Sequence, residues 1–247
     1  MPHPIRRLCL SLLLVLSAHV AHAAGDVLRV AVLSASPPVS YIDGNGKLAG
    51  FNIDIAHALC EAMEVRCELR VSTLDKVVDA VAAGEYDIAV VSLLATPERR
   101  RKVLFSKPYY RSTSVWFAPA KTAPETPGVR VAAVRGSAQA AYAQARGWTV
   151  VPMHSHDEMS QALASAAADA ALVPMLTALA LRQHPAVAGL GLTTTVLADA
   201  ALSGDVCISI APQHPALRTR VDAAIDRIKR DGRYDRINTQ HLPFKLQ

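Results

Sequence analysis

An anion-binding pattern occurs at Thr96-Pro97-Glu98-Arg99. Thr favours the N-cap of a helix, Pro its first position and Glu its first turn, so a helix is expected to begin here. Arg99 departs from the pattern because a cation in the first turn opposes the helix dipole. Free backbone N–H groups attract an anion, and an arginine fork can bind both oxygens of a carboxylate. The spacing predicts a carboxylate site, with a solvated run of cations as an equal alternative.

A second candidate site is Arg135-Gly136-Ser137, which follows one buried strand pattern and opens a helix pattern. Ligands of open α/β sheets bind beyond the carboxyl ends of strands. Gly136 lets the backbone approach a ligand closely, and the Ser137 hydroxyl offers a hydrogen bond. Ser92 ends another predicted strand and is a third donor. An ordinary serine N-cap and a plain strand end are the alternatives for the two serines.

Other chemistries have weaker support. His154 and His156 could bind a metal only with distant ligands, so a helix cap with exposed imidazoles is favoured. The sequence contains no Gly-x-Ser-x-Gly elbow, phosphate loop or dinucleotide fingerprint, and we expect no metal and no cofactor. Nine histidines and 21 acidic residues could still form a catalytic pair that lacks a local motif.

The elements that must position these residues form two similar runs. Strand patterns at 27–33, 67–71 and 86–92 alternate with helix patterns that begin at Asn52 and Thr73, the second ending at Gly84. This β-α-β-α-β order predicts an α/β fold. After a Pro-rich segment at 119–127 the order repeats, with strands at 129–134, 150–153 and 170–173 and helices from Ser137 and from the Ser155 capping box.

A late strand at 206–211 and helices from Pro215 and over 234–241 complete the chain. If the chain crosses between lobes near Ser112 and returns near 200–207, two crossings form a hinge on which the lobes close. The predicted organisation is 1–23 signal peptide, 24–112 lobe 1, 113–204 lobe 2, and 205–247 lobe 1 again. We therefore expect a two-lobed α/β fold with a ligand cleft between the lobes.

The first residues are organised as a signal peptide. Arg6 and Arg7 precede the apolar run 8–16, and Ala-His-Ala at 21–23 offers a cleavage site. The run is too short to cross a bilayer, which takes about 20 residues; a buried N-terminal helix is the alternative. Cys9 is misplaced for a lipid anchor. We expect a soluble periplasmic protein after cleavage.

Charge and length exclude other classes. The 247-residue chain has a formal net charge of +5, and loss of Arg6 and Arg7 leaves +3. Such a charge, spread along the chain, is not the basic patch of a nucleic-acid-binding protein. The length suits one large domain or two lobes of about 100 residues each. We expect a monomer with no nucleic-acid partner.

Three cysteines remain after export. Cys60 lies near the end of a predicted helix and Cys67 at the start of the next strand, so in the oxidising periplasm a disulfide is possible there. Metal binding would need further ligands at close spacing. Cys207 lies in an apolar strand pattern and is interpreted as a buried free thiol.

Together these motifs resemble the amino-acid-type family of periplasmic solute-binding proteins, family 3, over nearly all of the mature chain. The markers are Leu28-Arg-Val-Ala31, Pro38, Asn45-Gly-Lys-Leu-Ala-Gly-Phe51, Asp54, Gly84-Glu-Tyr-Asp87, Thr96-Pro-Glu-Arg99, Phe105-Ser-Lys-Pro-Tyr-Tyr110 and Asp231-Gly-Arg-Tyr234. The resemblance implies the two-lobed periplasmic-binding-protein-like (type II) fold, whose lobes close on a ligand, and delivery of that ligand to an ABC permease of the inner membrane. It also implies a disulfide between Cys60 and Cys67, as in the family's binders of basic amino acids.

The resemblance assigns roles residue by residue. Arg99 matches the arginine that grips the α-carboxylate of the ligand. Ser92 and Ser137 match polar positions that line the cleft, with Gly136 beside them. The remaining lining positions depart from the pattern: Leu94 replaces a common Ser or Thr, and Leu33 and Ser36 stand where an Asp and an aromatic residue are common.

The largest departure is Pro174, near the position of the acid that binds the α-amino group of the ligand. Burying an ammonium group without a partner costs several kcal/mol. We therefore expect a small carboxylate-bearing ligand, an amino acid or a related organic acid. The departure favours one without an α-amino group, unless Asp199 or Asp205 near the second crossing supplies the acid.

Two other functions use the same scaffold. Some family members resemble cyclohexadienyl dehydratases, which need a general acid in the second lobe, where Pro174 now stands. A ligand-sensing module for a membrane receptor would close in the same way as a transport protein. We expect no enzymatic activity.

Overall fold

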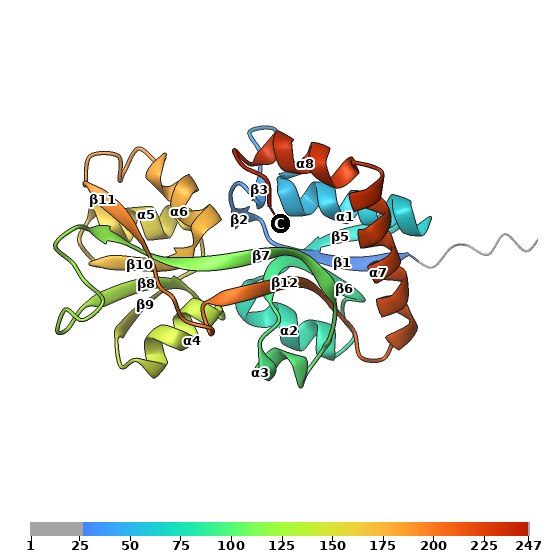
Figure 1. Ribbon diagram of the computed structural model, residues 1–247, viewed down its shortest axis with the longest axis horizontal. Coiled ribbons are helices and arrows are strands. Elements are labelled where there is room, and N and C mark those ends of the chain that lie inside the picture. Colours follow the sequence, from blue (N-terminus) through green and yellow to red (C-terminus); the bar gives the residue numbers. More distant parts are fainter. Residues whose placement is uncertain (1–26, 247) are drawn as a thin grey trace, which may run out of the picture.

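The computed structural model describes residues 27–246, so the predicted signal peptide, 1–23, lies outside the described residues. Two α/β lobes are joined by two long antiparallel strands, β7 (Leu104–Pro119) and β12 (Ser203–Ile210), at the centre of Figure 1. β7 pairs with β12 along its first part and with β10 (Ala170–Pro174) along its second. One continuous sheet therefore runs through both lobes.

Lobe 1, on the right of Figure 1, contains the strand order β5-β1-β6-β12-β7. β1 is parallel to β5 and β6, whereas β12 is antiparallel to both of its neighbours. The remaining strands of this sheet are β1 (Leu28–Val32), β5 (Cys67–Val71) and β6 (Ile88–Leu94). β6 is apolar and buried on both faces, as expected for a covered strand.

Helices cover both faces of the lobe 1 sheet. On one face α1 (Phe51–Met63), α7 (Pro215–Arg230) and α8 (Arg233–His241) pack together around Phe51 and Tyr234. On the other face α2 (Leu74–Ala82) packs its valines against the sheet. The short α3 (Pro97–Arg100) follows β6 directly. A small sheet of β2 (Ala35–Ser36), β3 (Ser40–Ile42) and β4 (Leu48–Ala49) precedes α1.

Lobe 2 has the strand order β7-β10-β8-β9, and β11 pairs with the other edge of β7. These strands are β8 (Arg130–Val134), β9 (Thr149–Met153) and β11 (Leu192–Val196). α5 (His156–Ala164) and α6 (Met175–Arg182) share one hydrophobic cluster with the sheet, and α4 (Ala138–Ala145) contributes to another. The predicted repetition of β-α-β-α-β is thus present in both lobes.

The two lobes also contain the same arginine–aspartate fork. Arg29 at the start of β1 donates its backbone N–H, Nε and Nη2 to Asp87, just before β6. Arg130 at the start of β8 makes the same three bonds to Asp169, just before β10. The Nη2–Oδ1 distance is 2.7 Å in each fork. Each fork fastens the first strand of its lobe to the third.

Some sequence-based expectations need correction. The prediction that Asn52 caps the first helix is wrong: Gly50 is the N-cap, and Asn52 is buried inside α1. The long strand β7 begins at Leu104, eight residues before the predicted extended stretch at Ser112. α6 and β11 had no counterpart in the sequence-based prediction.

The cysteines are arranged as expected. Cys60 near the end of α1 and Cys67 at the start of β5 form a disulfide, with their Cα atoms 6.1 Å apart. Cys207 in β12 is a buried free thiol. Among the described helices, none is both long and apolar enough to span a bilayer.

Candidate functional site

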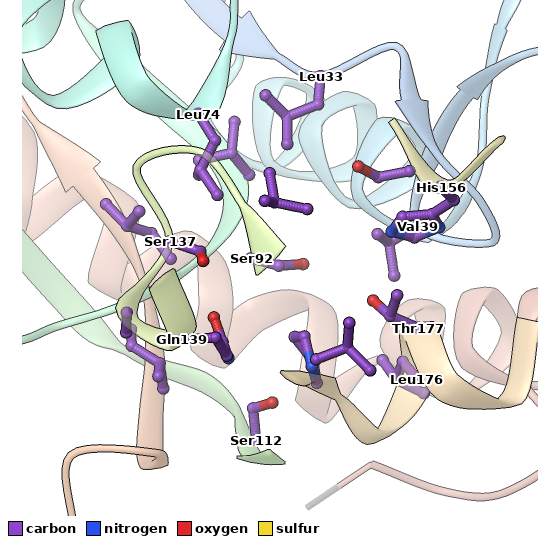
Figure 2. A pocket seen from close by; sticks show the side chains of 18 of the residues that line it. Leu33, Val39, Leu74, Ser92, Ser112, Ser137, Gln139, His156, Leu176 and Thr177 are labelled. Atoms are coloured by element: carbon purple, nitrogen blue, oxygen red, sulfur yellow. The ribbon is translucent and has the colours of Figure 1, made fainter. Parts of the chain in front are cut away.

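A cavity of about 80 Å³ lies between the lobes, and Figure 2 shows the side chains around it. Lobe 1 contributes residues from β6, α2 and α3, and lobe 2 contributes residues from β10, α4, α5 and α6. Most of the lining is apolar. The polar and titratable lining residues are Ser36, Ser92, Arg99, Tyr110, Ser112, Ser137, Gln139, His156 and Thr177.

Arg99 is the cationic group of this cavity. Thr96 caps α3 and accepts a hydrogen bond from the Arg99 backbone N–H at 3.4 Å, which fixes the arginine at the end of β6. Its Nη1 donates to the Leu94 carbonyl at 2.9 Å, and its Nη2 donates to the Gly136 carbonyl of the other lobe at 2.8 Å. A guanidinium carries five N–H donors, so three remain for a ligand.

Burial lowers the pKa of Arg99 to about 10, and only Glu98 partly offsets this effect. The side chain is therefore still a cation at neutral pH, in a site where its charge is poorly solvated. Neither of the two carbonyls that it contacts neutralises that charge. A ligand carboxylate would supply the missing negative charge and accept two hydrogen bonds from the fork.

Ser92 lies at the centre of the cavity wall, and its backbone has a φ of 56°, in the left-handed region that costs a non-glycine residue roughly 1–2 kcal/mol. Three hydrogen bonds hold it there. The Ser92 backbone N–H donates to the Tyr109 hydroxyl, which donates to Asn52 Oδ1, while Asn52 Nδ2 donates to Ser92 Oγ. Because Ser92 Oγ accepts from Asn52, its own proton is left to donate toward the cavity.

The triangle of hydrogen bonds that joins Ser92, Tyr109 and Asn52 leads to a prediction on stability. We expect Tyr109→Phe to lower the free energy of unfolding by roughly 1–3 kcal/mol, because the Ser92 N–H and Asn52 Oδ1 both lose a buried partner. Urea denaturation measures the change, with Tyr41→Phe, at a half-buried tyrosine outside the triangle, as control. Equal losses in the two variants would refute the role given to the triangle.

The two lobes approach each other closely at Gly136. Its φ is +75°, and a Cβ atom at this position would lie 2.4 Å from the Asp75 Cα atom in α2. The next residue, Ser137, is the N-cap of α4 and accepts from the Ala140 N–H at 3.0 Å. Only a glycine therefore lets the α4 end of lobe 2 meet α2 and bring its carbonyl to Arg99.

The structure brings most of the predicted site residues together. Ser36, Ser92, Leu94, Arg99 and Ser137 all line the cavity. Gly136 lines the groove beside the cavity instead, together with Arg99 and Ser137.

Sequence reasoning missed Gln139, Thr177 and His156. Gln139 is buried and donates from Nε2 to Ser114 Oγ in β7, 2.8 Å away. The expectation of an exposed imidazole is wrong for His156, which is only 5 % exposed and lines the cavity. The only local signal for these residues was their place in or next to a helix start at the carboxyl end of a lobe 2 strand.

No aspartate or glutamate lines the cavity within residues 27–246. The Asp205 carboxylate pairs with Arg111 at 3.1 Å and borders the outer groove. Asp199 Oδ1 accepts from the Ala201 N–H in its own loop. Neither residue supplies the acid that an α-amino group would need. The described residues also contain no group of three or more His, Cys, Asp and Glu side chains that could hold a metal ion.

Burial lowers the pKa of His156 to about 4, although the Pro37 carbonyl and the Asp157 carboxylate act in the opposite direction. Asp157 is exposed, and its carboxylate lies 3.5 Å from His184 Nε2. In the unfolded chain the pKa of a histidine is about 6.5. As the pH falls, His156 is therefore protonated in the unfolded state at a higher pH than in the folded state. The stability that neutral His156 contributes is complete above pH 6.5 and is lost as the pH falls toward 4.

We expect this loss to reach roughly 2 kcal/mol at pH 5. Urea denaturation of the wild type and of His156→Gln at pH 7 and pH 5 tests it, with exposed His154→Gln as control. The wild type and the control should lose more stability between the two pH values than His156→Gln does. The same loss in all three proteins would disprove the burial of a neutral imidazole.

Two lobes joined by a double crossing, with a half-buried cation in a cavity between them, define a solute-binding protein of the clamp type. The model for bacterial extracellular solute-binding proteins, family 3, matches residues 28–244. The chain therefore belongs to this family, as its motifs suggested.

Individual relatives match this chain over most of its length. The chain is 28% identical to an L-arginine-binding protein of Pseudomonas aeruginosa, over 91% of each chain. It is 27% identical to a lysine/arginine/ornithine-binding periplasmic protein of Escherichia coli, over 97% of each chain. A solved ancestral amino acid-binding protein, a precursor of cyclohexadienyl dehydratase, is 26% identical with a TM-score of 0.75, over 87% of this chain and 95% of that one.

Proposed function

We propose that this protein captures a small carboxylate in the periplasm and delivers it, as a monomer, to an ABC permease of the inner membrane. Residues 24–112 and 205–247 form lobe 1 and residues 113–204 form lobe 2, and the two strands between them act as the hinge. The change of partner along β7, from β12 to β10 after Thr113, supports this division. Cleavage of the signal peptide at residue 23 accounts for export.

In this proposal Arg99 binds the carboxylate of the ligand. Ser92 and Ser137 donate hydroxyl hydrogen bonds to it from lobe 1 and lobe 2. Gly136 permits the close approach of the lobes, and Leu94 and Ser36 form part of the wall. This assignment is supported because five of these six residues line one cavity. The sixth, Gly136, accepts a hydrogen bond from Arg99 through its backbone carbonyl.

The observation that carries the proposal is the charge of the lining. Arg99 is a half-buried cation whose pKa is lowered by desolvation, and no carboxylate of the described residues lines the cavity with it. The relatives that bind arginine or lysine take ligands with ammonium or guanidinium groups, which need acidic partners when buried. A ligand with a carboxylate and no α-amino group fits this lining better.

A thermal-shift screen of the mature protein, stripped of ligand by unfolding and refolding, tests the proposal. The panel contains keto acids, hydroxy acids, fatty acids, dicarboxylates and amino acids including L-arginine and L-lysine. A ligand at 100 times its dissociation constant adds about 2.7 kcal/mol of stability. We expect shifts from carboxylates without an amino group. Tight binding of L-arginine or of another α-amino acid would overturn the predicted ligand class.

The dehydratase alternative finds less support in the cavity. Dehydration with decarboxylation needs a general acid beside the substrate. Neither an aspartate nor a glutamate of residues 27–246 is in the lining, and His156 is neutral at physiological pH because its pKa is about 4. Incubation with prephenate and arogenate, followed by absorbance, provides the test, and turnover of either compound would establish an enzyme.

A further inference from the structure

His156 is a buried polar side chain that lines the cleft, and one of its two ring nitrogens has no hydrogen-bond partner. It is the first residue of α5 and is 5 % exposed. Its Nδ1 atom has no hydrogen-bond partner in the described part of the chain, and the other three buried side-chain atoms without a partner belong to Ser40, Ser209 and Tyr234, which do not line the cavity. Leaving such an atom unpaired costs roughly 1–3 kcal/mol, so its presence in a binding cavity needs an explanation.

His156 and Arg99 belong to different ends of the cavity. Figure 2 places Ser137 on one side, His156 on the other, and Ser92 between them. The Arg99 guanidinium bonds to the carbonyl of Gly136, next to Ser137, so it belongs to the Ser137 side. Thr177, with its hydroxyl group, and Val39 are drawn on the same side of this view as His156, and all three line the cavity. A ligand held by its carboxylate at Arg99 would therefore extend past Ser92 toward the imidazole.

We propose that His156 is a specificity-determining residue that binds an uncharged hydroxyl or keto group of the ligand, so that the cleft selects hydroxy- or oxo-monocarboxylates. This inference rests on the proposed carboxylate binding by Arg99. An imidazole has one nitrogen that donates and one that accepts, so it can bind either group. An unsubstituted acid would leave Nδ1 unpaired.

The charges around His156 favour an uncharged ligand group. Burial keeps the imidazole neutral, and the one carboxylate that acts on its pKa is that of Asp157, on its own helix. α5 packs against β2, β8, β9, β10 and α6. The charged residues of these elements are Arg130, which is engaged with Asp169, and Arg182, which bonds to Thr194. No cation of these elements is therefore placed to neutralise a second carboxylate, and a dicarboxylate would bury a charge beside a neutral ring.

Isothermal titration with matched ligands tests the proposal on the mature protein. The probes are unbranched monocarboxylates of three to six carbons, each as the plain acid, the hydroxy acids, the oxo acids and the dicarboxylate of equal length. We expect the best hydroxy or oxo acid to bind roughly tenfold more tightly than the plain acid of its length. In His156→Leu this difference should disappear while the plain acid still binds. His156→Gln, which keeps a hydrogen-bonding group, should retain part of it.

His154→Gln, at an exposed histidine two residues away, is the matched control and should keep the wild-type preference. If plain and substituted acids bind equally to the wild type, or if His156→Leu keeps the preference, the role of His156 is refuted while carboxylate capture stands. Preference for a dicarboxylate refutes it as well. If no carboxylate binds, the proposed function itself fails, and the inference fails with it.

Discussion

Arg99→Ala should abolish carboxylate binding, with a loss of affinity of at least about 100-fold, or roughly 3 kcal/mol. The reason is the environment of the guanidinium. It is half-buried, its pKa is lowered by desolvation, and its hydrogen bonds inside the protein go to two neutral carbonyls. A carboxylate is the one partner that neutralises this charge and fills the remaining donors. Isothermal titration with the best ligand of the screen measures the loss.

Two further variants sharpen this test. Arg99→Lys keeps the charge but loses the planar fork, so its affinity should lie between those of the wild type and Arg99→Ala. Arg101→Ala removes an exposed cation of the same run and should leave affinity unchanged. If Arg101→Ala weakens binding as much as Arg99→Ala does, the effect is a general one of surface charge, and the alternative of a solvated cationic run gains support.

Gly136→Ala should prevent full closure of the lobes and weaken ligand binding roughly 100-fold. The reason is that a ligand which binds only the closed form has an apparent affinity proportional to the fraction of protein that is closed. The added Cβ would lie 2.4 Å from Asp75 Cα and 2.7 Å from Asp75 N, and both of these are backbone atoms that no side-chain rotation can move. The Gly136 carbonyl would also move away from Arg99. Small-angle scattering with saturating ligand should show a larger radius of gyration than the wild type.

The chain provides a control for backbone strain. Gly147 has a φ of +74°, almost equal to that of Gly136, but nothing lies within 4 Å of a Cβ built on it. Gly147→Ala therefore carries the same left-handed penalty, about 1 kcal/mol, without a contact between lobes. It should lower stability and leave affinity and closure intact. Equal effects on affinity in the two variants would mean that backbone strain, not the contact between α4 and α2, is responsible.

The carboxylate half of the site was predictable from sequence because its signals are local. Thr96, Pro97 and Ser137 are residues typical of helix starts, and both helix starts follow apolar strands. The carboxyl ends of such strands meet where ligands bind. Arg99 stood out as a cation at the wrong end of a helix, and Gly136 as a glycine between strand and cap.

The half of the site around His156 was not predictable from sequence. Whether a single helix residue is buried there depends on the element that packs against it from across the cleft. The Ser155 cap of α5 was recognised, but His156 is buried by the packing of α5 against β2, which lies about 120 residues earlier in the sequence. The full length of β7 was missed because Lys107 and Pro108 interrupt its apolar pattern and because its pairing with β12 shifts register near Pro108.

The matching forks of Arg29–Asp87 and Arg130–Asp169 have a consequence for the symmetry of the cleft. They align β1 with β8, β6 with β10, and therefore α2 with α5. In this alignment the first residues of the two helices, Leu74 and His156, are equivalent positions, and both face the cavity. The two walls of the cleft are therefore built from matching helix starts, one bearing an apolar side chain and the other an imidazole. A difference at this one pair of positions makes one wall apolar and the other able to form hydrogen bonds.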